Sequence, residues 1–277
     1  MKKIIIIGKN SFIGKNLFSL LKNNLLIKKL SYEEFISLKK ISNVDYIINC
    51  TSNIHYVKKP YKAKNDFDYQ VALKIKDLKT KLVFLSSRKV YKPNQAIKES
   101  GKLYLSSNYA KNKILTEKKL KKILNNKVLV LRISNIIGPI NNHKTDKTLK
   151  RKIHTTFIDH FFSNVKKGLI FENNRNYKDF ISIKKLSEIV LKLITKNIVG
   201  TFNISMGKRV YLSLLVEWLN FHNKRYLDCI DLPVEYNKEC FYLNNNKLKK
   251  TINIIITLKE LENYCKNLSM KYFKKNK

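Results

Sequence analysis

The sequence predicts an α/β fold in which a doubly wound parallel sheet carries helices on both faces. Three observations support this prediction. Short apolar runs rich in β-branched residues, typical of strands buried on both faces, alternate with segments of helical spacing. Such alternation is the pattern of parallel sheets. The length of 277 residues allows one large domain or two small ones, with a sizeable core.

Composition narrows the class of protein. Hydrophobic residues make up 44% of the chain, which is ordinary for a globular protein. The sequence has no run of 18 apolar residues, so we expect no membrane span. The apolar run after Met1 is too short for a signal peptide. We expect reduced thiols and a cytoplasmic protein, because no Cys-x-x-Cys pair exists among Cys50, Cys229, Cys240 and Cys265.

The net charge of +37 has two interpretations. It could serve a polyanionic partner such as nucleic acid or an anionic membrane. It could also reflect an AT-rich genome, since Lys outnumbers Arg by 51 to 6 and Asn and Ile are abundant. The lysines are spread along the chain, and specific nucleic-acid contacts depend mainly on Arg. We favour the compositional interpretation and do not expect a nucleic-acid partner.

The chain begins with a strand over 2–7, a glycine-containing turn and a helical segment over 15–21. This order is the context required of a dinucleotide-binding fingerprint. The glycines permit a tight turn, and the helix N-terminus faces a pyrophosphate. The cofactor-binding residues predicted in this turn are Gly8, Asn10, Ser11, Phe12, Ile13 and Gly14.

A second strand is expected over 25–30. NAD-specific enzymes usually place an acidic residue at its end, for the ribose 2′-hydroxyl. Here Lys28, Lys29 and Ser31 occupy that neighbourhood, and Lys9 lies in the turn. Basic groups suit the 2′-phosphate of NADP, so Lys28 is included among the cofactor residues. Lysine is so abundant that such a match arises by chance almost half the time. The sequence therefore predicts NAD or NADP, with a slight preference for NADP.

The next segments read as a helix over 32–41, strands over 44–48 and 81–86, and a helix over 66–78. The strand over 81–86 leads into Ser87, and about twenty residues later Tyr109 and Lys113 share one face of a helix. A free tyrosine has a pKa near 10. A cation about 4 Å away is worth up to roughly 4 kcal/mol at an effective dielectric of about 20. Such an effect would make a phenol an acid/base near neutral pH. The alternative is an amphipathic surface tyrosine beside one more solvated lysine.

A further strand over 128–134 contains Arg132, which is costly in a buried sheet unless it is paired, so we expect a structural role for it. Asn135 follows at the carboxyl end of this strand, where ligands of open α/β sheets bind. The rest of the chain predicts a loop over 141–150, helices over 153–165, 183–195 and 212–219, strands over 168–172 and 200–204, and a closing helix from 258.

Together these motifs resemble the short-chain dehydrogenase/reductase superfamily, and more closely its extended branch of nucleotide-sugar epimerases, dehydratases and reductases. The resemblance covers almost the whole chain, with two departures: the branch has Gly at the position of Ser11 and Arg at that of Lys178. The matching motifs are Gly8 to Gly14, Ser87 with Tyr109-x-x-x-Lys113-x-x-x-Glu117, Arg132-x-x-Asn135-x-x-Gly138-Pro139, Lys178-Asp179-Phe180 and Gly200-x-x-Asn203.

The resemblance implies a Rossmann-type domain over 1–139, completed by about 176–204, and a smaller interleaved substrate lobe over 140–175 and 205–277. It implies that Cys50, Thr51 and Ser52 meet the cofactor phosphates and ribose. It also implies that the substrate diphosphate meets basic groups, since guanidinium forks fit phosphate; ordinary surface arginines are the alternative. The substrate-binding candidates are Arg88, Asn135, Arg175 and Arg209.

The function implied is an NAD(P)-dependent enzyme that moves a hydride to or from a nucleotide-linked sugar. Tyr109 would exchange the proton, Lys113 would activate it and bind the nicotinamide ribose, and Ser87 would orient the substrate oxygen. Dehydratases of the branch have an acid pair after their catalytic hydroxyl, whereas Arg88 and Lys89 follow Ser87. We therefore expect an epimerase or reductase.

A second hypothesis is a non-catalytic cofactor-binding scaffold or an RNA-binding relative of the same family, which would have no need of the three catalytic candidates. We assign no metal ligand. The sugar, the base and the oligomeric state stay open, with a homodimer among the options.

Overall fold

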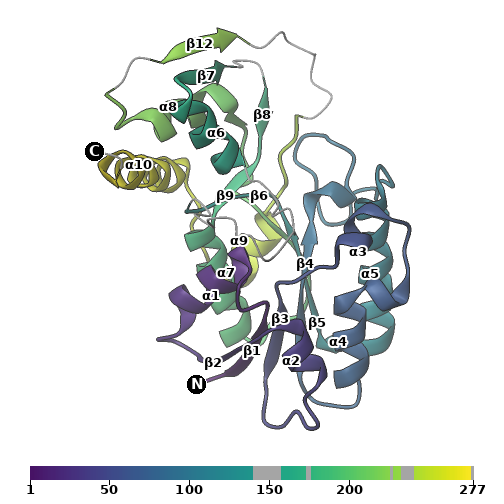
Figure 1. The fold of residues 1–277 in the computed structure, drawn as a ribbon. Helices are drawn as coiled ribbons and strands as arrows, with labels where there is room; N and C mark the ends of the chain where they lie inside the picture. Colours follow the sequence, from purple (N-terminus) through teal and green to yellow (C-terminus); the bar gives the residue numbers. More distant parts are fainter. Residues whose placement is uncertain (140–156, 173–175, 225–226, 232–239, 276–277) are drawn as a thin grey trace.

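The computed structural model describes residues 1–139, 157–172, 176–224, 227–231 and 240–275 (Figure 1). Six strands form one sheet in the order β10-β5-β4-β3-β1-β2, and every neighbouring pair in it is parallel. This confirms the predicted fold class. The strands are β1 (Lys3–Ile7), β2 (Leu26–Leu30), β3 (Tyr46–Asn49), β4 (Lys81–Ser87), β5 (Val128–Ile133) and β10 (Gly200–Ile204).

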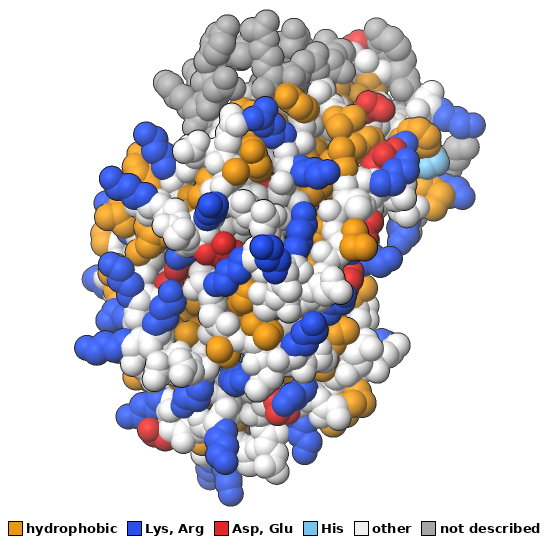
Figure 2. Space-filling model, turned by 180° about the vertical axis from the view of Figure 1, so that it is seen from behind, with side chains coloured by type: hydrophobic (Ala, Val, Ile, Leu, Met, Phe, Trp, Pro, Cys, Tyr) orange, Lys and Arg blue, Asp and Glu red, His pale blue; other side chains and the backbone are white. Residues whose placement is uncertain are grey.

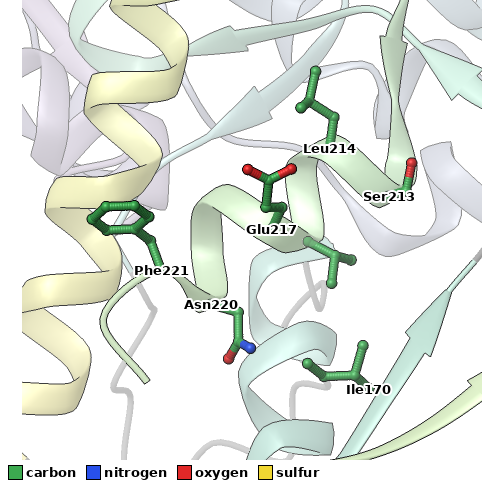
Figure 3. Close-up of a pocket in the computed structure, with 7 residues that line it drawn as sticks. Ile170, Ser213, Leu214, Glu217, Asn220 and Phe221 are labelled. Atoms are coloured by element: carbon green, nitrogen blue, oxygen red, sulfur yellow. The ribbon is translucent and has the colours of Figure 1, made fainter. Parts of the chain in front are cut away.

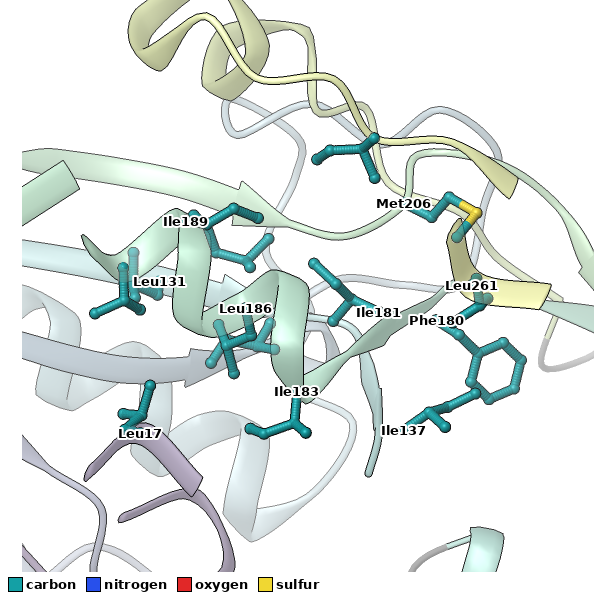
Figure 4. Packing of buried hydrophobic residues seen from close by; sticks show 14 of the residues in the cluster. Leu17, Leu131, Ile137, Phe180, Ile181, Ile183, Leu186, Ile189, Met206 and Leu261 are labelled. Carbon is teal, nitrogen blue, oxygen red and sulfur yellow. The ribbon is translucent and has the colours of Figure 1, made fainter. Parts of the chain in front are cut away.

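Helices cover both faces of this sheet. Ile4 and Ile6 of β1 belong to the core cluster under α1 (Phe12–Leu21) and α7 (Ile183–Thr195), part of which Figure 4 shows. Ile5 and Ile7 belong to the cluster on the opposite face, under α2, α4 and α5. Burial on both faces explains why β1 is a continuous apolar run. The helices of the second face are α2 (Tyr32–Ile36), α4 (Phe67–Ile75) and α5 (Asn108–Leu124).

A smaller group of elements lies beyond the carboxyl edge of the sheet, where its strands end (Figure 1). We call α6 (Phe157–Lys166), β7 (Leu169–Glu172), α8 (Leu212–Asn220) and β12 (Asp228–Asp231) the small lobe. In this lobe β7 pairs with β12, and α8, which carries the buried Trp218, packs against α10 (Leu258–Lys275). By contrast, α9 (Asn246–Ile252) packs against β10 and α7 of the large sheet.

Short strands join the two parts. β6 (Asn135–Ile137) pairs with β9 (Phe180–Ser182), and β8 (Tyr177–Lys178) pairs with β11 (Val210–Tyr211). Between β8 and β9, the fully buried Asp179 accepts hydrogen bonds from the backbone N–H groups of Met206 at 3.0 Å, Gly207 at 3.2 Å and Leu243 at 2.9 Å. One carboxylate thus fastens two distant segments of the chain to the start of β9, which leads directly into α7.

Most predicted elements are present, and the differences are at their ends. The helix expected over 32–41 ends at Ile36. Lys74 of α4 satisfies two carbonyls at this end, since it donates to those of Ile36 at 2.6 Å and Leu38 at 2.8 Å. The strand expected over 44–48 spans 46–49, and the helix expected over 66–78 spans 67–75. The predicted loop over 141–150 and the first turn expected at 153–156 lie outside the described residues. The remaining short helices are α3 (Ile54–Lys58) and the 3-10 turns Ala63–Asn65, Arg88–Val90 and Asn125–Lys127.

A buried ion pair joins the large sheet to α5. Arg132 of β5 donates to both oxygens of Glu117 from α5, through Nε at 3.1 Å and Nη2 at 2.6 Å. Both side chains are buried. Arg132 also donates to the Tyr91 hydroxyl at 2.7 Å and the Glu99 carbonyl at 2.9 Å, while Ser86 Oγ donates to Glu117 at 2.6 Å. The bidentate pair confirms the structural role predicted for Arg132.

The positive charge is dispersed. Figure 2 shows lysine and arginine side chains scattered over the whole visible face rather than gathered in one patch. Several lysines donate to backbone carbonyls: Lys74 as above, Lys127 to Leu78 at 2.8 Å and Lys247 to Thr201 at 2.8 Å. Among the residues that the structure describes, every helix is too short or too polar to cross a membrane.

We predict that Glu117→Gln lowers the free energy of unfolding by about 3 kcal/mol or more, because it leaves the Arg132 charge buried without its counter-ion. Urea denaturation followed by circular dichroism measures this. Glu188→Gln is the matched control, since its ion pairs with Lys185 and Lys192 are partly solvated, and should cost less than about 1 kcal/mol. Equal losses in the two variants would contradict the prediction.

Candidate active site

The carboxyl ends of β1 and β3 are the first feature of the candidate site. After β1 the chain crosses to β2 on one side, and it returns to β3 on the other side of β1. Ligands of open α/β sheets bind outside the carboxyl ends of the strands at such a switch point. The turn over 8–11 and the segment after Asn49 meet here, since the Cys50 N–H donates to the Ile7 carbonyl at 2.8 Å.

The turn after β1 depends on two glycines. Gly8 has φ +100°, and a Cβ on it would come within 2.7 Å of Thr51 Cγ2. A Cβ on Gly14 would come within 2.4 Å of the Gly8 carbonyl oxygen. Ser11, which replaces the family's middle glycine, caps α1: its Oγ accepts from the Gly14 N–H at 3.0 Å. The turn therefore keeps the backbone close to the helix N-terminus, an arrangement that suits a phosphate.

The remaining cofactor candidates near β1 and β2 differ in their exposure and in the element that carries them. Asn10 is exposed in the turn, while Phe12 and Ile13 are half-buried in the first turn of α1. The Phe12 ring packs so closely against Gly138 that a Cβ on this glycine would come within 2.4 Å of Phe12 Cζ. Lys28 pairs with Ile5 in mid-strand and lines a hollow of about 470 Å³ formed with the loop over 38–44. Its backbone is therefore two residues short of the carboxyl end of β2.

Tyr109 and Lys113 lie on one face of α5. Lys113 Nζ is 5.8 Å from the centre of the Tyr109 ring. Lys113 is buried, donates to the Leu85 carbonyl at 2.8 Å and lies 4.4 Å from the centre of the Phe84 ring, whereas Tyr109 is half-buried. Because Leu85 precedes Ser87 by two residues in β4, this hydrogen bond holds the first turns of α5 beside the carboxyl end of β4.

The two serines that end β4 differ. Ser86 is buried and donates its hydroxyl to Glu117, as described above. Ser87 is half-buried, and its Oγ accepts from the Lys89 N–H at 3.2 Å, which caps the short turn that follows. Because successive side chains of a strand point to opposite faces, only one of the two can join the ion pair. Ser87 is thus the more accessible hydroxyl at this strand end.

A polar network that the sequence did not reveal lies behind this edge. Asp68 of α4 is buried and accepts from Asn49 Nδ2 at 3.0 Å. Asn49 Oδ1 in turn accepts from the Thr51 N–H at 3.0 Å and hydroxyl at 2.6 Å, which holds Thr51 against Gly8. Ser52, the next residue, is exposed. Burial raises the pKa of Asp68 to about 7, although the Lys113 ammonium lowers it. Acidic residues are common in the first turn of a helix, so no sequence pattern singled out Asp68.

Two of the substrate candidates contact aromatic rings from distant parts of the chain. The Arg88 guanidinium is 4.0 Å from the centre of the Phe241 ring. The Arg209 guanidinium lies 5.2 Å from the Tyr177 ring centre and 5.7 Å from that of Tyr242, and it donates to Gln95. The neighbours Phe241 and Tyr242 therefore contact one arginine each. Neither aromatic residue carried a sequence signal.

Asn135 has a structural partner. Its backbone N–H and its Nδ2 donate to the Asp179 carbonyl, at 3.3 Å and 3.1 Å, at the start of the β6–β9 pair. The fourth candidate, Arg175, lies outside the described residues. Arg88 and Arg209 thus contact two adjacent residues of the chain, Phe241 and Tyr242. The Asn135 amide joins β6 to the start of β9.

A separate hollow of about 500 Å³ lies in the small lobe, along α8 (Figure 3). It contains none of the candidate residues. The residues that line it are Ile170, Ser213, Leu214, Val216, Glu217, Asn220 and Phe221.

Comparison with protein families matches residues 4–205 to the NAD dependent epimerase/dehydratase family. The comparison with curated proteins found no match.

Many solved structures are similar in fold, among them the following three. UDP-N-acetylglucosamine 4-epimerase from Methanobrevibacter ruminantium M1, in complex with UDP-N-acetylmuramic acid, has TM-score 0.75 and 18% identity and covers 99% of both chains. dTDP-glucose 4,6-dehydratase from Bacillus anthracis, in complex with NAD, has TM-score 0.74 and 16% identity, covering 99% of this chain and 97% of that one. dTDP-4-dehydrorhamnose reductase from Bacillus anthracis, in complex with NADP, has TM-score 0.75 and 15% identity, covering 99% and 100%. At these identities the likeness shows a shared fold.

The raised pKa of Asp68 has a consequence for stability. Between the pKa of about 4 of an unfolded Asp and the folded value of about 7, the folded state binds more protons, so stability falls as pH rises through this range. Asp68→Asn keeps the acceptor for Asn49 and removes the ionisation. We predict that the parent loses roughly 1 kcal/mol relative to this variant for each pH unit between 5 and 7. Urea titrations at several pH values measure this, and parallel curves would contradict it.

Proposed function

Because this chain belongs to the NAD dependent epimerase/dehydratase family, we propose that it is a nicotinamide-dependent epimerase or reductase of a nucleotide-linked sugar. The observation that supports this most is the pair on α5: a half-buried phenol one turn from a buried ammonium, with the Nζ 5.8 Å from the ring centre. Tyr109 and Lys113 lie next to the strand that ends in Ser87. These are the three groups that a proton exchange with a sugar oxygen requires.

The edge at β1 and β3 fits a dinucleotide. The two crowded glycines bring the backbone close to the start of α1, where the N–H groups of the first turn lack partners within the helix. Those of Phe12 and Ile13 would hold the pyrophosphate. A bound nicotinamide cofactor supplies or takes up the hydride. The cofactor is NAD or NADP, and the lysines near β2 give a slight preference for NADP on the sequence alone. The other residues proposed to contact it are Gly8, Asn10, Ser11, Gly14, Cys50, Thr51 and Ser52, whereas Lys28 lines the hollow formed with the loop over 38–44.

The chain's own residues handle the proton. When a sugar alcohol becomes a ketone it loses a hydride and a proton, and we assign the proton to the Tyr109 oxygen. The Lys113 ammonium, one helical turn away, donates to the nicotinamide ribose. The Ser87 hydroxyl orients the sugar oxygen. In the reverse direction Tyr109 returns the proton, so the same three groups serve epimerisation and net reduction.

The nucleotide end of the substrate would lie between the large sheet and the small lobe. Arg88 and Arg209 are proposed to bind its diphosphate, because guanidinium forks match phosphate oxygens, and Asn135 and Arg175 complete the substrate candidates. Arg88 and Lys89 follow Ser87 where dehydratases of the family carry acids, so we propose an epimerase or reductase rather than a dehydratase.

The alternative is a non-catalytic scaffold that binds a cofactor or RNA, which the charge of +37 suggested. The scatter of lysines over the visible face argues against it (Figure 2). RNA affinity that resists salt and ignores the cofactor would favour the scaffold.

We predict that Tyr109→Phe lowers kcat by about 10² to 10⁴-fold, since that is the usual contribution of an acid/base group. Cofactor affinity should change little, because the phenyl ring remains. Tyr69→Phe is the matched control: its ring contacts the Lys119 ammonium, and its activity should equal that of the parent. Turnover of the true substrate by Tyr109→Phe at the parent's rate would refute the assigned role.

The reaction type is tested by incubating the protein with a panel of nucleotide sugars and NADPH while following the absorbance of the reduced cofactor. We expect at least one sugar to be converted. Net oxidation of the cofactor identifies a reductase, whereas a new sugar with no net change identifies an epimerase. Conversion of none of the panel, with the cofactor bound, would count against a nucleotide-sugar substrate.

A further inference from the structure

One corner of the carboxyl edge carries a charge pair that the proposed reaction does not use. The N–H groups of Gly8 and Lys9 donate to the Leu30 carbonyl at 2.8 and 3.1 Å, so the glycine turn lies against the end of β2. Ser31 then caps the N-terminus of α2. Across this corner the Lys9 ammonium donates to a carboxylate oxygen of Glu34. The two side chains are 40% and 46% exposed, so a ligand can reach both.

Glu34 is also held from within its own helix. Ser31 Oγ accepts from the Glu34 N–H at 3.1 Å, and the Ser31 N–H donates to Glu34 Oε2 at 2.6 Å, which together form a capping box. The hydrogen bonds from Lys9 and Ser31 lower the pKa of Glu34, so the carboxylate is ionised at neutral pH. A fixed negative charge therefore lies at the end of β2, although the strand itself ends in Lys-Lys-Leu.

The other lysines of this neighbourhood are directed elsewhere. Lys29 Nζ lies 3.8 Å from the centre of the Phe18 ring of α1. Lys28 lines the hollow formed with Leu38 and the loop that follows it. Lys9 is thus the lysine that a group at this corner would meet, and Glu34 neutralises it.

This inference rests on the proposed function, because it requires a dinucleotide with its adenosine ribose at the end of β2. At that position an acidic side chain suits the 2′-hydroxyl of NAD, and a basic one suits the 2′-phosphate of NADP. We propose that the Lys9–Glu34 pair makes this chain prefer NAD over NADP. The carboxylate accepts from the 2′-hydroxyl and repels a 2′-phosphate, which would also have to compete for Lys9. The lysines near β2 favour NADP in the sequence alone, and the Glu34 carboxylate reverses that preference in the folded chain.

Isothermal titration of the full chain with NAD and with NADP tests this, independently of turnover. The parent should bind NAD more tightly. Glu34→Gln keeps the capping box, since Gln serves equally at this position, and removes the charge. Its affinity for NADP should rise roughly tenfold, because one repulsion is lost and Lys9 is released. Its affinity for NAD should change by less than about threefold.

Two further variants sharpen the test. In Lys9→Met/Glu34→Gln most of the gain for NADP should disappear, because the released ammonium carries it. Glu33→Gln removes a neighbouring exposed carboxylate for which the structure shows no contact with Lys9 among the described side chains, and it should leave the NAD/NADP ratio unchanged. The gain in Glu34→Gln should also shrink at high salt, since the charges are exposed.

The outcomes separate the two claims. A parent that binds NADP more tightly than NAD, or a Glu34→Gln variant with the parent's ratio, overturns this inference and leaves the proposed function in place. A parent that binds neither dinucleotide overturns both.

Discussion

The arrangement of the site depends on the buried ion pair between Arg132 and Glu117. It fastens α5 to the middle of the sheet, because Glu117 also accepts from Ser86 of β4. Lys113, one turn before Glu117, then reaches the Leu85 carbonyl of the same strand. A buried charge pair tolerates little displacement, since each partner is costly to leave alone. The helix that carries Tyr109 is therefore fixed against the strand that ends in Ser87.

The carboxyl edge is organised by a second set of polar contacts. Asp68 holds Asn49, Asn49 holds Thr51, and Thr51 occupies the space that a side chain on Gly8 would need. Hydrogen bonds thus connect α4 and the end of β3, and packing extends the connection to the turn after β1. The carboxylate of Asp68 lies close enough to the Lys113 ammonium for that charge to lower its pKa. The two halves of the site, at β1–β3 and at β4–α5, are therefore electrostatically linked.

Sequence patterns predicted what is local and periodic. The sheet followed from continuous apolar runs, and Tyr109 and Lys113 followed from helical spacing and a family motif. The contacts of Lys74 with the carbonyls at the end of α2 could not be predicted, because Lys74 comes from another helix. Nor could the roles of Asp68 and Tyr242, which come from contacts between segments far apart in the chain. Such contacts leave no trace in the spacing of one sequence.

The central claim is that Tyr109 and Lys113 face a nicotinamide ring bound at the carboxyl edge of the sheet. A crystal structure of the protein grown with saturating NAD or NADP tests it most directly. We expect the pyrophosphate at the start of α1, Lys113 Nζ hydrogen-bonded to the nicotinamide ribose and the Tyr109 hydroxyl beside the ring. A cofactor bound elsewhere, or one whose ring lies away from both side chains, would contradict it.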